Sequence, residues 1–166
     1  VTSMKAIGCV GLISDGPSRD VDAIRKLDFQ MLLGGVTAGH GDMAVHAVNV
    51  PVSVAGMDVA TGELIHMDEN GAVELPIDGE LDLHTFRPAD IPDLLDDYLE
   101  ACVRLGVSPV RIIHGKGSGI QRKRVQAILD RHPLVVRWQS APAEAGGWGA
   151  TLAELKLATA GGGPEE

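Results

Sequence analysis

Two histidines and one aspartate of this chain have the types and spacing that suit acid–base chemistry. Asp82 and His84 stand on either side of Leu83, and this alternation predicts a strand whose polar side chains point to one face. A carboxylate placed there can orient an imidazole that takes a proton from water or from a ribose hydroxyl. His114 follows another apolar run and would join them if the two strands pair. We therefore predict Asp82, His84 and His114 as catalytic residues that divide the roles of base and acid, with a structural role as the alternative for each histidine.

The segment that follows His114 has the composition of an anion site. Its three glycines, at 115, 117 and 119, alternate with Lys116 and Ser118 between an apolar run and a predicted helix. Glycines let the backbone approach a ligand closely, and a helix N-terminus offers N–H groups and the positive end of its dipole. Because position 120 is isoleucine, the loop matches neither the Walker A nor the GxGxxG motif, and no nucleotide cofactor is predicted. A tight strand-to-helix turn is the other interpretation.

Basic residues gather around this loop although the chain is acidic. The net charge is −9, and residues 1–72 hold four basic and nine acidic side chains, whereas residues 111–137 hold seven basic and one acidic. A local positive patch suits phosphate binding, although a solvated helix face has the same composition. An aromatic ring beside such a patch can stack on a base, unless it packs on the sheet. The predicted nucleic-acid-binding residues are Gly115, Lys116, Gly117, Ser118, Gly119, Arg122, Lys123, Arg124 and Trp148.

Strands and helices alternate along the second half of the chain. Apolar residues recur at spacings of three and four over 91–105, which predicts a helix that Arg87-Pro88 opens and Gly106 ends. A second helix is predicted at 125–132, before Pro133. Short apolar runs predict strands at 81–83, 110–113, 134–139 and 150–155. The order is βαβαββ, which predicts an α/β sandwich.

Three short sequences in this half occur together, and they resemble the small MutS-related (Smr) domain family over about residues 73–157. They are LDLH at 81–84, HGKGSG at 114–119 and GGWGAT at 146–151. The resemblance implies the fold of the C-terminal domain of translation initiation factor three, with DNA or RNA as partner and cleavage or nicking of a phosphodiester as the activity. Thr85 stands where many members have glycine. A module that binds nucleic acid without cleaving it is therefore an alternative.

The first half is expected to be β-rich, a partial α/β segment. Glycine- and valine-rich runs predict strands within residues 6–13, 29–33, 45–54, 64–65 and 72–75, with turns between them. One short helix is predicted after Asp20, from the apolar positions Val21, Ile24 and Leu27. The segment 76–79 breaks this pattern, and we place the end of the first half there, at residue 76.

A second resemblance covers residues 6–76, with DGPSRD at 15–20 as its most specific element. This segment resembles the C-terminal half of the family of the regulator of ribonuclease E activity and 4-hydroxy-4-methyl-2-oxoglutarate aldolase. The resemblance implies that Arg19 contacts an oxoacid substrate and that Asp20 helps to hold a divalent cation such as Mg²⁺, which would polarise a carbonyl. The site is expected to be incomplete, since the family's upstream acidic residue and glycine-rich loop do not precede Val1. An ion pair at a helix start is the other interpretation.

These observations predict a two-part chain: an aldolase-like segment at 1–76, an Smr domain at 77–157 and a disordered tail at 158–166. The predicted function is nucleic-acid binding with endonuclease activity, and the alternative is a metal-dependent oxoacid lyase. No apolar run is long enough to span a membrane, and neither cysteine belongs to a CxxC pair. A cytoplasmic location, no membrane partner and a possible divalent cation are expected, and oligomerisation through the N-terminal segment is left open.

Overall fold

The computed structural model describes residues 1–39, 41 and 44–157. The chain divides into two compact units, Val1–Leu75 and Pro76–Glu166. Both combine helices with small sheets, so the chain is mixed α/β. Residues 158–166, for which the sequence predicts a disordered tail, lie outside the described residues.

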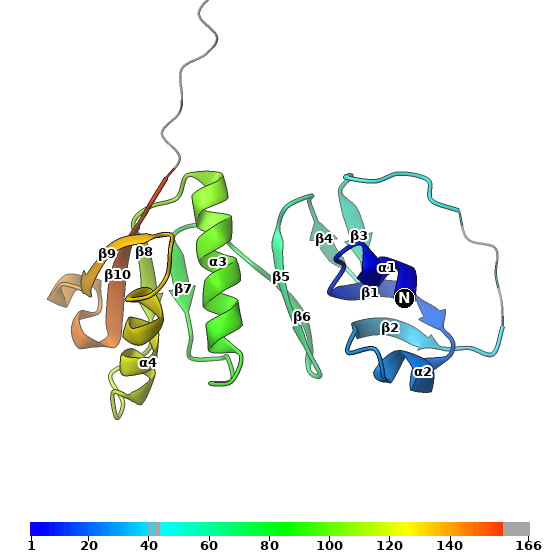
Figure 1. Ribbon diagram of the computed structural model, residues 1–166, viewed down its shortest axis with the longest axis horizontal. Coiled ribbons are helices and arrows are strands. Elements are labelled where there is room, and N and C mark those ends of the chain that lie inside the picture. The colour runs from blue at the N-terminus through cyan, green and yellow to red at the C-terminus, as the bar shows by residue number, and fades with distance from the viewer. Residues whose placement is uncertain (40, 42–43, 158–166) are drawn as a thin grey trace, which may run out of the picture. The chain divides into compact units, whose positions relative to one another are not determined.

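The second unit follows the predicted order of elements. Its strands form one sheet in the order β7-β8-β10-β9, in which β7 runs parallel to β8 while β10 is antiparallel to both its neighbours (Figure 1). The parallel pair needs a crossover, which α3 supplies. The elements are β7 (Glu80–Asp82), α3 (Ile91–Leu105), β8 (Val110–Ile113), α4 (Ile120–Leu129), β9 (Val135–Ser140) and β10 (Ala150–Leu155), with two 3₁₀ turns, η1 (Ala143–Ala145) and η2 (Gly147–Gly149).

Helix α3 carries much of the core of this unit. Its periodic apolar residues are buried as far as Cys102, whereas Leu105 at the end of the helix is exposed. The Tyr98 hydroxyl donates to the carbonyl of Glu80 at 3.0 Å, which ties the helix to β7. Gly106 ends the helix in the left-handed conformation, as predicted. The predicted start was wrong: the helix begins at Ile91, with Pro92 in its first turn. Arg87 instead donates from Nε to the Asp90 carboxylate at 2.8 Å, in the segment before the helix.

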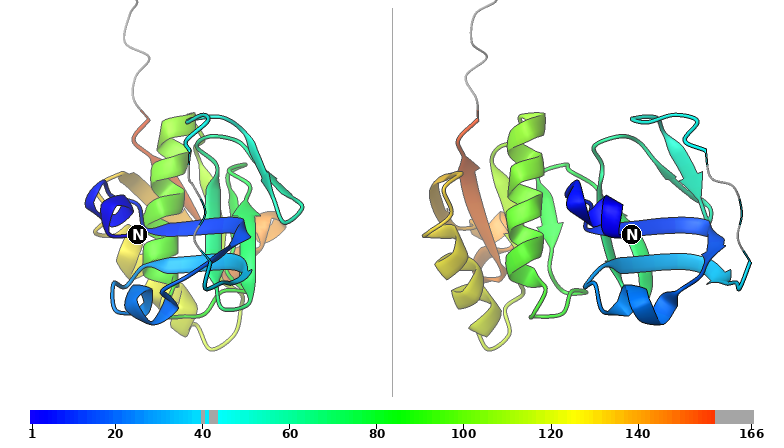
Figure 2. Two further views of the ribbon diagram at one scale, coloured as in Figure 1. Left: turned by 90° about the vertical axis from the view of Figure 1, so that its right-hand side faces the viewer. Right: turned by 45° about the vertical axis from the view of Figure 1, so that its right-hand side comes forward.

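The described residues of the first unit form three two-stranded sheets. Strands β1 (Gly11–Ser18) and β2 (Gln30–Val36) run parallel, with α2 (Val21–Arg25) between them in the chain (Figure 2). The antiparallel pairs are β3 (Val52–Val54) with β4 (Met57–Val59), and β5 (Leu64–Asp68) with β6 (Gly71–Leu75).

Two strands predicted for the first unit begin later than the apolar runs that predict them. Residues 6–13 do not form one strand, because α1 (Thr2–Ala6) is closed by Gly8, at φ +91°, and β1 starts only at Gly11. The run at 45–54 is extended only from Val52. Asn49 has the left-handed φ of 55° and Pro51 lacks an N–H, so the backbone there cannot join a ladder.

Candidate functional site

The end of β7 presents Asp82 and His84 on one exposed face, as the alternation predicts. Leu83 is buried between them, and their side chains are 58% and 57% exposed. The Asp82 carboxylate oxygen Oδ1 accepts the backbone N–H of His84 at 2.9 Å and lies 2.5 Å from its ring Nδ1. The backbone hydrogen bond from His84 is the main reason why the pKa of Asp82 lies below its ordinary value. Asp82 is therefore a carboxylate that fixes the His84 ring.

The other side of the His84 ring lies against Gly115. Asp82 pairs with Ile113 of β8, and the Leu83 N–H donates to the Ile113 carbonyl at 2.8 Å, so the ends of the two strands stay together. A Cβ atom built on Gly115 would lie only 2.7 Å from His84 Nε2, and the glycine has a φ of +77°. Glycine is thus required here for both its conformation and its size. With Nδ1–H donated to Asp82, Nε2 is the ring nitrogen that accepts a proton.

His114 sits in a different environment from His84. It is 7% exposed, its Nδ1 lies 3.2 Å from the Gly115 carbonyl, and its Nε2 lies 2.9 Å from the Thr151 hydroxyl. A carbonyl only accepts, so Nδ1 carries the hydrogen and Nε2 accepts from Thr151 in the neutral ring. Burial lowers the pKa of His114, and the nearby positive charge of Arg122 also lowers it. The neutral form is therefore favoured.

Thr151 is a site residue that the sequence analysis did not single out. It is fully buried on β10, opposite Ile112 of β8. The signal was present in the GGWGAT sequence, whose last residue is this threonine. A hydroxyl at a buried strand position needs a hydrogen-bond partner, and His114 is a suitable one.

The glycine loop is held by the segment that contains Trp148. The backbone N–H groups of His114 and Gly115 both donate to the Gly149 carbonyl, each at 2.9 Å. A Cβ atom on Gly149 would lie 3.2 Å from Lys116 Cγ, so the two segments touch. Gly119, at φ +77°, then starts α4. The loop borders a cavity of about 310 Å³ together with Pro88, Arg122 and Arg124.

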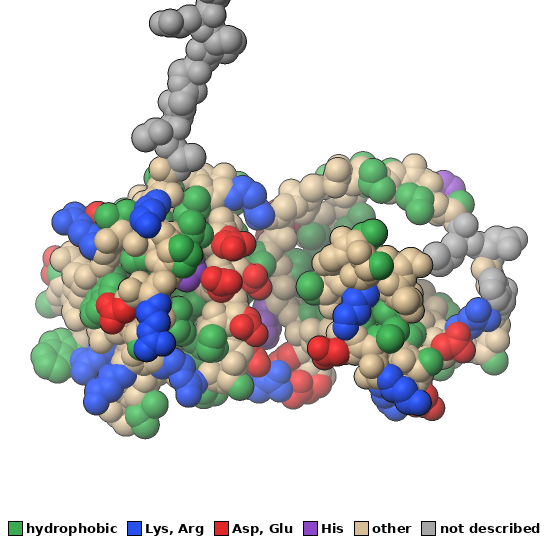
Figure 3. Space-filling view, viewed as in Figure 1, with side chains coloured by type: hydrophobic (Ala, Val, Ile, Leu, Met, Phe, Trp, Pro, Cys, Tyr) green, Lys and Arg blue, Asp and Glu red, His purple; other side chains and the backbone are tan. Residues whose placement is uncertain are grey.

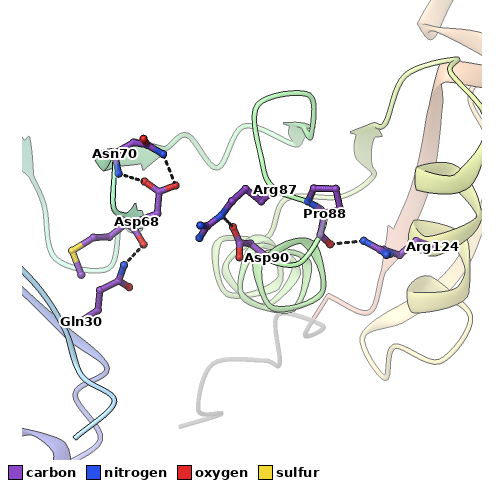
Figure 4. Close-up of polar contacts among 8 residues, drawn as sticks. Gln30, Asp68, Asn70, Arg87, Pro88, Asp90 and Arg124 are labelled. Carbon is purple, nitrogen blue, oxygen red and sulfur yellow. Dashed lines mark hydrogen bonds and ion pairs between the residues drawn. The ribbon is translucent and has the colours of Figure 1, made fainter. Parts of the chain in front are cut away.

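The predicted basic residues do come together at the start of α4, but they have different surroundings. Lys116 and Lys123 are exposed. Arg124 donates to the Pro88 carbonyl (Figure 4). The Arg122 guanidinium carbon lies 5.0 Å from the ring centre of Trp148, which is 74% exposed and does not pack on the sheet. Two of the four cations are thus already engaged within the unit.

Opposite charges separate on the surface of this unit. In the space-filling view of Figure 3, lysine and arginine side chains lie over α4 and acidic side chains lie over α3. The acidic group on α3 is Asp93, Asp96, Asp97 and Glu100, all exposed. Removal of water from around the Asp97 carboxylate by its neighbours raises its pKa, and repulsion from three nearby acidic side chains raises it further.

Arg19 and Asp20 form an exposed ion pair in the first unit. Arg19 Nε lies 3.4 Å from the Asp20 carboxylate, and both residues border a cavity of about 980 Å³ with Ser18 and Thr37. Throughout the described residues, no group of three or more His, Cys, Asp and Glu side chains could hold a metal ion. Asp20 offers one carboxylate, already paired with a cation, so these residues do not fit a divalent-cation site.

Two protein families match this chain, one in each of its two units. The family model of the Smr domain matches residues 81–156. These residues are an Smr domain. The RraA-like family model, Aldolase/RraA, matches residues 1–73. Both resemblances predicted from the sequence are confirmed. No described helix is long and apolar enough to cross a membrane.

The relatives of the Smr domain are much longer proteins. The endonuclease MutS2 of Thermomicrobium roseum is 38% identical over 81 residues, which cover 49% of this chain and 10% of that protein. The endonuclease MutS2 of Helicobacter pylori is 43% identical over 75 residues, 45% of this chain and 10% of that protein. The chain thus spans about a tenth of these curated relatives.

Two solved structures resemble about half of the chain. The Smr domain of Thermus thermophilus MutS2 is 35% identical, with 46% of this chain and 96% of that chain covered and a TM-score of 0.45. YdaL, a stand-alone small MutS-related protein from Escherichia coli, is 25% identical, with 49% and 66% covered and a TM-score of 0.46.

Proposed function

We propose that the Smr domain binds nucleic acid and cleaves a phosphodiester bond. One observation carries the proposal: the His84 imidazole is oriented by Asp82 and lies with Nε2 against the glycine loop at Gly115. A proton acceptor is thereby next to backbone suited to a phosphate. The relatives named endonuclease MutS2 support the same class of reaction.

His84 is the general base of the proposed reaction. Its Nε2 takes a proton from water or from a ribose hydroxyl as that oxygen forms a bond to phosphorus. The bond from phosphorus to the leaving oxygen breaks, and the leaving oxygen takes a proton from solvent. Asp82 keeps the ring in the correct tautomer and stabilises the imidazolium that forms. Lys116 and the loop N–H groups stabilise the negative charge on the phosphate.

His114 is assigned a positioning role in this scheme. The sequence predicts it as a second proton-transfer group. However, its Nδ1 lies within hydrogen-bond distance of the Gly115 carbonyl and its Nε2 within that of the Thr151 hydroxyl, so both ring nitrogens are engaged. Such a ring connects the loop backbone to β10. We therefore expect His114→Gln to alter loop stability and activity together, whereas His84→Gln alters activity alone.

A nuclease assay tests the proposed function. The substrates are structured RNA, single-stranded DNA and supercoiled plasmid, each with and without Mg²⁺. His84→Ala should lower the rate by about 10²- to 10⁴-fold and leave binding within a few-fold, since removal of a positioned base acts on the reaction step. His46→Ala, an exposed histidine of the first unit, is the matched control. Cleavage that survives in His84→Ala refutes the site, and binding without cleavage by the wild type supports the non-catalytic alternative.

An oxoacid lyase is the second candidate function. Two observations favour it: the RraA-like match over residues 1–73 and the cavity beside Arg19 and Asp20. Within the part of the chain that the structure describes, no group of side chains could hold the cation that this chemistry needs, which speaks against it. Pyruvate release from aldol substrates in the presence of Mg²⁺, abolished by Asp20→Ala, would place this function first.

The domain limits and the fold of the Smr half are also proposals. We propose that residues 1–76 and 77–157 are separate domains, which the division into two compact units supports. We further propose that the βαβαββ half shares the fold of the C-terminal domain of translation initiation factor three. If the two parts are separate domains, a fragment of residues 77–157 unfolds cooperatively by itself. A fragment that fails to do so contradicts the proposed domain limits.

A further inference from the structure

Trp148 is a large aromatic ring kept at the surface of the Smr domain. It is 74% exposed although the Arg122 guanidinium lies 5.0 Å from its ring centre. A cation at that distance covers one face of the ring and holds it in place. With 74% of the residue exposed, most of the ring surface stays in contact with solvent. An exposed ring of this size suits contact with a ligand, since burial of aromatic surface is favourable.

Trp138, the second tryptophan, differs from Trp148 in its surroundings. Trp138 on β9 is half-buried, and its Nε1–H donates to the Asp130 carboxylate at 2.8 Å. Its polar end is satisfied inside the unit, as is usual for tryptophan in a folded protein. Trp138 therefore serves as the internal control for Trp148.

Trp148 is also close to the proposed phosphate site. Its neighbour Gly149 accepts the N–H groups of His114 and Gly115, and lies against Lys116. Arg122 both covers the ring and lines the loop cavity. A nucleotide whose base lies on Trp148 would thus have its phosphate beside Lys116.

We infer that Trp148 and Arg122 form a stacking platform for an unpaired base, so that the domain selects single-stranded nucleic acid over a duplex. The inference rests on the proposed function. A base within a duplex has both faces covered by its neighbours, whereas an unpaired base can place one face on a protein ring. The surrounding cations Lys116, Arg122 and Lys123 favour a nucleic acid over an apolar protein partner as the occupant.

Fluorescence titration of the full chain tests the platform. Trp138→Phe leaves Trp148 as the one tryptophan of the two in the sequence. Single-stranded oligonucleotides of DNA and RNA should quench its emission, and the duplex of the same sequence should not. Trp148→Ala should weaken single-strand binding by about 5- to 150-fold, the range for loss of one stacked base, with less than about twofold change for the duplex. Trp148→Phe should recover most of the affinity, because a smaller ring still stacks.

The outcomes separate this inference from the proposed function. Equal affinity of the wild type for single strand and duplex, or an unchanged Kd in Trp148→Ala, overturns the platform even if cleavage depends on His84. Quenching by single strands without cleavage supports the platform and refutes the proposed nuclease activity. Equal loss of both substrates in Trp148→Ala means that the ring positions the loop, which also overturns the inference.

Discussion

The contact between Gly115 and His84 gives the sharpest prediction from this structure. In Gly115→Ala the new methyl group would lie 2.7 Å from His84 Nε2, closer than carbon and nitrogen can approach, at a backbone φ of +77°. The left-handed conformation costs a non-glycine residue about 1–2 kcal/mol. His84 must also move, which takes Nε2 away from the loop. We expect Tm to fall by about 4–8 °C per kcal/mol, and the cleavage rate to fall by about 10²- to 10⁴-fold, as for loss of the base.

Gly35→Ala is the control for this prediction. Gly35 lies on β2 of the first unit, outside the proposed site, and nothing is within 4 Å of its added Cβ. We expect near wild-type cleavage, binding and Tm. Cleavage rates are compared by single-turnover assay, and nucleic-acid binding should stay within a few-fold in both variants.

A double variant shows whether Gly115 acts through His84. If it does, Gly115→Ala adds little to His84→Ala, because the base is already absent. Additive losses would mean that the methyl group disturbs phosphate binding instead. Wild-type cleavage by Gly115→Ala would refute the placement of His84 against the loop.

Three further predictions concern charge. Lys116→Ala and Lys123→Ala should each reduce the slope of log Kd against log salt by roughly 0.7 for a single strand, whereas the exposed Lys26→Ala should not, as a salt titration will show. Asp82→Asn should lower kcat by about a hundredfold with KM changed less than a few-fold, because the ring loses its orienting carboxylate; a KM effect alone contradicts this. Since burial holds the pKa of His114 below its ordinary 6.5, protons bind the unfolded chain more readily, so Tm should fall as pH drops below 6.5. His114→Gln should flatten that decline, and an unchanged pH profile would contradict the buried neutral ring.

The Smr half was predictable because its signals are strong and local. The period of α3, the left-handed Gly106 at its end and the alternation around Leu83 each depend on a few neighbouring residues. The start of α3 was not predictable in this way. Proline suits either a turn or a first helical turn, and only the structure shows that Pro92, not Pro88, takes the helical place.

Contacts between distant segments set the limits of sequence reasoning in the site. The pairing of His114 with Thr151 joins residues 37 positions apart, and that of Arg122 with Trp148 depends on how η2 meets α4. Charge and spacing predict that Arg122 lies near a phosphate loop, but not that its guanidinium covers an indole. In the first half, Gly8 and Asn49 interrupt apolar runs that composition alone predicts as strands.

The separation of acidic α3 from basic α4 gives the Smr domain a preferred orientation in the field of a polyanion. A nucleic acid repels the carboxylates of α3 and attracts the cations of α4, so the encounter exerts a torque that turns the loop and Trp148 toward the strand before contact. This effect acts over about one Debye length, near 10 Å at 0.1 M salt. If the domain binds nucleic acid as proposed, this charge separation lets an acidic protein meet its partner through the face of α4.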